Sequence, residues 1–182
     1  VDDVRGSTKY LSSNVTDAET TNTNRLTSFD ADGFTVGNAG GSINGSGEKI
    51  VAWCWDAGSG SPVSNTSGSI TSTVKANAAY GMSIISYTGT GSNATVGHGL
   101  SSAPELLIVR NRDVVYNWRV WSEALTGAQL LYLNTTDSHQ TSSAMVDSTT
   151  PTSSVSSLGT NGGANGHGNA HTTTPFHNMT SY

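Results

Sequence analysis

Short apolar runs alternate with turn-forming residues along this chain, at the spacing expected of β-strands. The runs are rich in Val, Ile, Thr, Tyr and Trp, and clusters of Gly, Asn, Ser and Pro separate them, which is typical of an all-β sandwich or barrel. Strands are predicted near residue 10 and at 33–37, 49–55, 69–77, 81–89, 105–112, 117–123 and 129–134. We therefore expect an all-β fold, an antiparallel β-sandwich of jelly-roll, immunoglobulin-like or concanavalin-like form, with little or no helix.

Alternation within a run predicts which strands are buried. Successive side chains of a strand point to opposite faces, and in KIVAWCW, residues 49–55, both sets are apolar. This pattern is typical of a central strand covered on both sides, and the consecutive apolar residues 106–109 share it. The predicted core therefore contains Val51, Trp53, Cys54, Trp55 and Leu106 to Val109.

Composition and charge exclude several classes of function. The 182 residues carry 8 Lys and Arg against 13 Asp and Glu, a net charge of −5, without a basic cluster. Because nucleic-acid-binding proteins need a positive surface, we expect no nucleic-acid partner. No apolar run approaches the roughly 18 residues of a membrane-spanning helix, so no membrane insertion is expected. The only cysteine, Cys54, excludes an internal disulfide.

Three ordered motifs recur along the chain at an offset of about 121 residues, which indicates an internal repeat. We therefore divide the chain into residues 1–66, the back half of one sandwich unit, and residues 67–182, a second unit. The recurring pairs are KYLSSNVTDAETT from Lys9 with LYLNTTDSHQTSS from Leu131, FTVG at 34–37 with SSLG at 156–159, and NGSGEKIVAWCW at 44–55 with NGHGNAHTTTPF at 165–176.

A half-unit has consequences for assembly, because it would leave unpaired backbone groups along an open sheet edge. Either residues 1–66 close onto residues 67–182 within one chain, or the edge pairs with a strand of a neighbouring chain by β-augmentation. In this scheme the apolar run 49–55 is a core strand. Its copy at 170–176, which is rich in Thr and contains a proline, is predicted to be an edge strand.

Several segments resemble a repeated domain of structural proteins from tailed bacteriophages, and the resemblance covers most of the chain. It implies a β-sandwich in a fibre-like or virion-associated protein, located outside the cell or on the virion, and it brings no catalytic residues. The segment NAHTTTPFHN, at 169–178, departs from the pattern, which would place an aromatic-rich strand there. The segments that carry the resemblance are SIISYTGTGSNATVGHGLSSAPELLIVRNR at 83–112, TTPTSSVSSLGT at 149–160 and NGSGEKIVAWCW at 44–55.

Catalytic motifs are absent from the sequence, which has no nucleophile elbow and keeps Cys54 inside an apolar run. A polysaccharide depolymerase would need a carboxylate pair in a cleft, and nothing singles out Glu105, Asp113 or Glu123 for that role. We therefore expect no enzymatic activity and no cofactor.

The candidate glycan-binding residues are Tyr116, Arg119 and Trp121, since an aromatic platform beside a polar group is a surface on which sugar rings stack. Alternation places Trp118 with Val120 on one face and Arg119 with Trp121 on the other. Only one of the two tryptophans can therefore be a platform, and core packing is the competing interpretation.

Two further motifs suggest metal ligands. His167, His171 and His177 could share a metal if their segment folded back, but a solvated terminal strand and turn is the preferred interpretation. FDADGF, at 29–34, resembles the start of a calcium loop but lacks the remaining ligands, so a turn between two strands is the preferred interpretation.

The leading functional hypothesis is a non-enzymatic structural protein that self-assembles with copies of itself, through strand exchange or augmentation, into a fibre or a virion-associated assembly. The second hypothesis is a carbohydrate-binding module that attaches a phage to glycans on its host.

Overall fold

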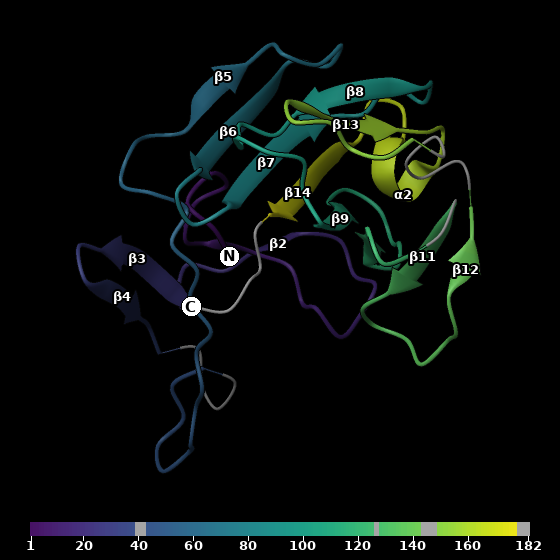
Figure 1. Ribbon diagram of the computed structural model, residues 1–182. Helices are drawn as coiled ribbons and strands as arrows, with labels where there is room; N and C mark the ends of the chain where they lie inside the picture. Colours follow the sequence, from purple (N-terminus) through teal and green to yellow (C-terminus); the bar gives the residue numbers. More distant parts are fainter. Residues whose placement is uncertain (39–42, 126–127, 143–148, 178–182) are drawn as a thin grey trace.

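The computed structural model describes residues 1–38, 43–125, 128–142 and 149–177, and nearly all of its regular structure is β-strand. This confirms the predicted all-β class. An antiparallel sheet of eight strands forms the body of the molecule, and three further sheets have two strands each (Figure 1). The helix α2 is a single turn at Gly162–Asn165.

The main sheet consists of two meanders with the last strand of the chain between them. Five of its strands were predicted from their alternating apolar residues, namely β6, β7, β9, β10 and β11. In spatial order the strands are β12 (Gln140–Thr141), β11 (Gln129–Tyr132), β10 (Arg119–Ser122), β9 (Leu106–Asn111), β14 (Ala170–Phe176), β7 (Met82–Thr88), β6 (Ser72–Asn77) and β5 (Val63–Asn65).

The strand β14 lies at the centre of this sheet, so the prediction that 170–176 is an edge strand was wrong. It pairs antiparallel with β9 on one side and with β7 on the other. His171, Thr172 and Thr173 are buried. The Thr-rich sequence suggested a solvated strand, but strand preferences depend on context, and here two neighbours supply the backbone pairing.

One face of the main sheet is covered by α2 and by a small sheet of β8 (Ala94–Gly97) and β13 (Val155–Leu158), which gives a sandwich (Figure 1). The predicted apolar run 106–109 contributes Leu107 and Val109 to this interior, while Leu106 and Ile108 are half-buried. Two apolar clusters form the core, Leu107 with Val109, Trp121, Leu130 and Ala164, and Ile70 with Val74, Ile85, Tyr87, Val96 and Leu158.

The N-terminal segment crosses the opposite face of the sheet. The Glu19 carboxylate accepts hydrogen bonds from Arg5 at 2.6 Å and from Arg112, which follows β9, at 2.8 Å. Burial opposes ionisation of Glu19, but these two guanidinium groups outweigh it and lower the pKa of the carboxyl. Arg110 donates to the carbonyl oxygen of Thr16 at 2.6 Å. Polar contacts therefore attach the start of the chain to the main sheet.

Two small hairpins complete this N-terminal part. In the first, β1 (Lys9–Tyr10) pairs with β2 (Thr20–Thr21). In the second, β3 (Leu26–Asp30) turns into β4 (Gly33–Val36), which confirms that FDADGF is a turn between strands. The Asp30 carboxylate accepts hydrogen bonds from the hydroxyls of Ser28 and Thr35 at 2.8 and 2.7 Å, so it stabilises the hairpin.

Residues 44–56, which we call the arm, have neither helix nor strand and project away from the main sheet (Figure 1). The predicted strand 49–55 is therefore wrong for this structure, and so are its core positions Val51, Trp53, Cys54 and Trp55, which are all exposed. The physical reason is that a strand with two apolar faces needs a packed layer over each face as well as a neighbouring strand on each side, and the described residues around the arm supply neither. In the main sheet, β14 already occupies the central position.

Candidate functional site

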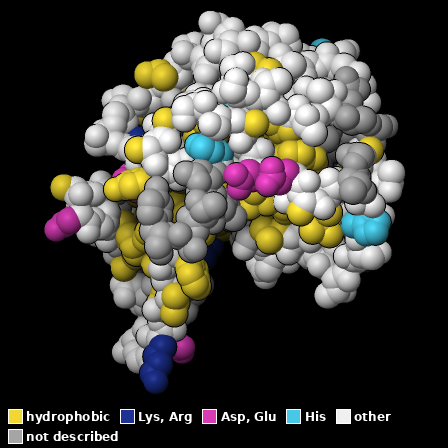
Figure 2. Space-filling view, viewed as in Figure 1, with side chains coloured by type: hydrophobic (Ala, Val, Ile, Leu, Met, Phe, Trp, Pro, Cys, Tyr) yellow, Lys and Arg dark blue, Asp and Glu magenta, His cyan; other side chains and the backbone are white. Residues whose placement is uncertain are grey.

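The arm presents a cluster of exposed apolar side chains. Val51 is 77% exposed, Trp53 79% and Trp55 64%, and Ile50 and Cys54 are exposed beside them. In Figure 2 the arm projects downward with hydrophobic side chains along it and charged side chains near its end. A tryptophan buries about 150–250 Å² when it is covered, and contiguous apolar exposure of this kind marks interaction surfaces.

The turn that opens the arm, at 44–47, resembles the turn before β14 in one glycine conformation and one asparagine hydrogen bond. Gly47 and Gly168 both have positive φ angles, 78° and 73°. The Asn44 amide donates to the carbonyl oxygen of Gly37 at 3.0 Å, and the Asn165 amide donates to that of Gly159, also at 3.0 Å. Each acceptor glycine directly follows a strand, β4 in one case and β13 in the other. The two segments therefore begin from the same local fold.

The surroundings of the two turns differ. Asn165 is fully buried. Its side chain also donates to the carbonyl oxygen of Ser92 at 2.6 Å and accepts from the backbone N–H of Thr90 at 2.8 Å. Asn44 is exposed. Thr90 and Ser92 lie in the stretch between β7 and β8.

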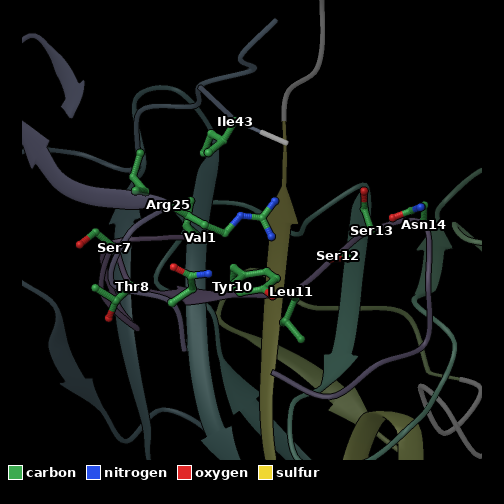
Figure 3. Close-up of a pocket in the computed structure, with 12 residues that line it drawn as sticks. Val1, Ser7, Thr8, Tyr10, Leu11, Ser12, Ser13, Asn14, Arg25 and Ile43 are labelled. Carbon is green, nitrogen blue, oxygen red and sulfur yellow. The ribbon is translucent and has the colours of Figure 1, made fainter. Parts of the chain in front are cut away.

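A hollow of about 330 Å³ lies beside the start of the arm (Figure 3). Its apolar lining includes Tyr10, Leu11, Leu26 and Ile43, and the Arg25 guanidinium lies 4.3 Å from the centre of the Tyr10 ring. The recurring motifs align Ile43 with Ala164 and Tyr10 with Tyr132. Ala164 belongs to a buried core cluster that also contains Leu107, Val109 and Trp121, and Tyr132 packs against this cluster.

The strand β14 is unusually polar for the centre of a sheet. His171 is completely buried and stacks on Tyr87 with ring centres 5.3 Å apart. Its Nε2 lies 3.5 Å from the Gly166 carbonyl oxygen, and its Nδ1 has no hydrogen-bond partner within the described part of the chain. Burial lowers the pKa of His171 to about 4, so the imidazole is neutral at pH 7.

The predicted glycan platform is not formed. Trp121 is only 3% exposed and packs in the core with Leu107 and Leu130, so no face of its ring is free to stack on a sugar. Arg119 is 5% exposed, and its guanidinium lies over the half-buried Tyr116 at 5.2 Å from the ring centre. Alternation correctly placed Arg119 and Trp121 on one face, but that face is the interior, which corrects the choice of Trp121 as the platform.

The three candidate metal ligands are also separated. His171 is inside the sheet, whereas His167 is exposed and lies 3.0 Å from the Thr90 carbonyl oxygen. His177 follows the other end of β14, a strand of seven residues, which is about 20 Å long. Among the described residues, no group of three or more His, Cys, Asp or Glu side chains could hold a metal ion. The predicted histidine site is therefore corrected, because an extended strand keeps its ends apart.

Comparison with known families gives one match. A family model described as a domain of unknown function covers residues 1–182. The chain belongs to the DUF7483 family. Searches of curated proteins and of solved structures found no match. In the described residues of this DUF7483 chain, no helix is long and apolar enough to cross a membrane.

Sequence reasoning missed the contribution of the short elements to this site. The strands β8 and β13, of four residues each, and the single turn α2 were not predicted, because such short elements lack a readable alternation. The role of Asn165 was also missed. The recurrence of Asn-Gly-x-Gly at 44–47 and 165–168 was the signal that could have identified it in this DUF7483 chain.

Proposed function

We propose that this protein is a non-enzymatic structural protein that self-assembles, with the arm of one copy docking as a β-strand in the sheet of another. One observation carries the proposal. The run 49–55 is apolar on both faces, is exposed and has no strand partner among the described residues, although its counterpart in the repeat is the central strand of the main sheet. A segment of this composition gains free energy by being covered, at about 25 cal/mol for each Å² of apolar surface removed from water.

The surroundings of the arm support the same proposal. The hollow beside Tyr10 and Ile43 is lined by apolar side chains that no further layer covers among the described residues. Asn44 is exposed, whereas Asn165 is buried and hydrogen-bonded to Thr90 and Ser92. Both features are expected if residues 1–66 are the back half of a unit whose front half comes from elsewhere. Strand addition is a common mode of recognition because the backbone supplies affinity and alternate side chains supply specificity.

The location of the assembly is part of the proposal. The resemblance to structural proteins of tailed bacteriophages supports an extracellular fibre or a virion-associated position. Glycan attachment has no equivalent support, since Trp121 and Arg119 are buried.

The experiment that tests self-assembly compares two pairs of exposed apolar residues. Trp53→Ser with Trp55→Ser removes the aromatic groups of the arm, and Val114→Ser with Val115→Ser is the matched control outside it, at side chains that are 38% and 65% exposed. Light scattering coupled to size exclusion would give the mass at increasing protein concentration. We expect the natural chain and the control to associate, and the arm variant to associate at least tenfold more weakly.

Two results would contradict the proposal. One is a natural chain that keeps the mass of one copy up to the highest soluble concentration. The other is an arm variant that associates as strongly as the control.

A further inference from the structure

We infer that the arm of one copy takes the place of β14 in a second copy, between β7 and β9. This inference rests on the proposed function and adds the acceptor. The central position of the sheet, and not one of its exposed edges, is the site that the arm fits, so assembly proceeds by strand exchange.

The internal repeat gives the register of the exchange. At an offset of 121 residues, residues 49–55 align with Ala170–Phe176, the whole length of β14. Within the sheet, His171 lies opposite Asn111 and Tyr87, and Thr173 lies opposite Val109 and Ile85. The arm residues at the positions of His171 and Thr173 are Ile50 and Ala52. Both positions face the core that α2 and the small sheet cover.

Each of these replacements suits the buried position better than the residue now in it. Ile50 would remove the desolvation of a buried imidazole whose Nδ1 has no partner in the described part of the chain. Ala52 would remove the buried hydroxyl of Thr173. The apolar surface that the arm now exposes to water would be covered at the same time. The arm is therefore the better occupant on the core-facing side.

The backbone hydrogen bonds of the sheet give a second reason why the arm fits the position of β14. Proline has no N–H, and Pro175 lies where β14 pairs with β9 opposite Leu107 but where its pairing with β7 is interrupted between Thr173 and Phe176. At the position of Pro175 the arm has Cys54, which carries an N–H. A central strand without proline can pair with both neighbours over its whole length.

The remaining face also accepts the arm. Thr174 and Phe176 are half-buried on the face that carries Ile108, and their counterparts are Trp53 and Trp55. Trp55 already contacts Phe176 edge-on, with ring centres 6.5 Å apart, so the base of the arm lies at the end of β14. Two copies that meet at this end bring each arm close to the other's central strand.

Exchange between copies requires less rearrangement than replacement within one chain. Within one chain, the arm would have to swing in from outside the sheet and lie along β14, a strand of seven residues that is about 20 Å long. The arm is joined to the β3–β4 hairpin, and Ser7 donates to the Thr27 carbonyl oxygen of that hairpin at 3.0 Å. A second copy can offer its central position without breaking these contacts.

The experiment locks β14 in place reversibly. Ser86 and Thr172 lie opposite each other on β7 and β14, and both are close to cysteine in size. The variant Ser86→Cys with Thr172→Cys, made in a Cys54→Ala background, would form a disulfide across the two strands when oxidised, which free-thiol titration verifies. The Cys54→Ala chain alone is the matched control. Mass is measured by light scattering, and protection of residues 48–57 and 168–177 by hydrogen exchange.

We expect the oxidised variant to remain monomeric and the reduced variant to associate as strongly as the Cys54→Ala control. On association of the reduced and natural chains, residues 48–57 should gain protection and residues 168–177 should lose it. Equal association of the oxidised and reduced variants, with 168–177 still protected, would overturn the inference while leaving the proposed function intact, because the arm would then be adding to an edge. The same exchange of protection at the mass of one copy would also overturn it, since replacement would be occurring within one chain.

Discussion

The arm and β14 begin from the same turn and end in opposite environments. The run 49–55 of the arm and the strand β14 each follow an Asn-Gly-x-Gly turn whose last glycine has a positive φ angle, and in both turns the asparagine amide donates to a glycine carbonyl oxygen 3.0 Å away. The apolar run 49–55 is nevertheless in water, while the polar run 170–176 is in the middle of the sheet.

This difference shows that neighbours, more than composition, decide whether a run becomes a strand. β14 has β7 and β9 beside it, and it is buried despite His171 and Pro175. The arm has the composition of a core strand but has no pair of neighbours within the described part of the chain. The preference of Val, Ile and Trp for strands comes from packing against neighbouring strands and covering layers, so it does not produce a strand where these are absent.

The largest expected effect on stability is that of replacing a tryptophan of the core, compared with replacing one of the arm. Trp121→Ala should lower the free energy of unfolding by about 3–5 kcal/mol, because it opens a cavity in the core, whereas Trp53→Ala should change it by less than about 0.5 kcal/mol. Urea denaturation of the two variants at a concentration where the natural chain is one copy measures both. Equal losses would mean that the arm is part of the folded body.

Much of the fold was predictable because its apolar strands alternate clearly. The segments around Val74, Ile85, Val109 and Trp121 were identified from sequence, and each lies in the core. The errors lie in the site. The sequence KIVAWCW suits a central strand. Whether the chain provides neighbouring strands for it depends on contacts between residues that are distant in sequence. The central place of Thr173 could not be predicted for the same reason.

The next effect is a pH dependence that β14 has and the arm lacks. Because burial lowers the pKa of His171 to about 4 from an ordinary value near 6.5, the unfolded chain binds a proton between these pH values that the folded chain does not. Stability should therefore fall as the pH drops from 6.5 to 4, by about 1.4 kcal/mol per unit and about 3 kcal/mol in total.

The groups around His171 are Tyr87, Asn111, Asp113 and Arg119, and of these only the Asp113 carboxylate favours the charged imidazole. His171→Ile, which introduces the residue found in the arm, should flatten the loss measured by denaturation at pH 7, 5.5 and 4. The exposed His139→Gln is the control and should keep the full dependence. An unchanged slope in His171→Ile would assign the dependence to another group, such as the buried His98, whose pKa burial also lowers.

The smallest expected effect separates the shared turn from its two environments. Alanine is strained at the positive φ angles of Gly47 and Gly168, and no heavy atom lies within 4 Å of an added Cβ at either position, so the substitution tests the backbone alone. Gly168→Ala should lower the free energy of unfolding by about 1 kcal/mol, because its turn is fixed by the buried Asn165. Gly47→Ala should leave it unchanged, because the arm can relax in water without unfolding the sheet. In the associated form, where the arm would be held as a strand, the Gly47→Ala penalty should reappear as association weakened by about fivefold, and its absence there would mean that the turn of the arm is not fixed by docking.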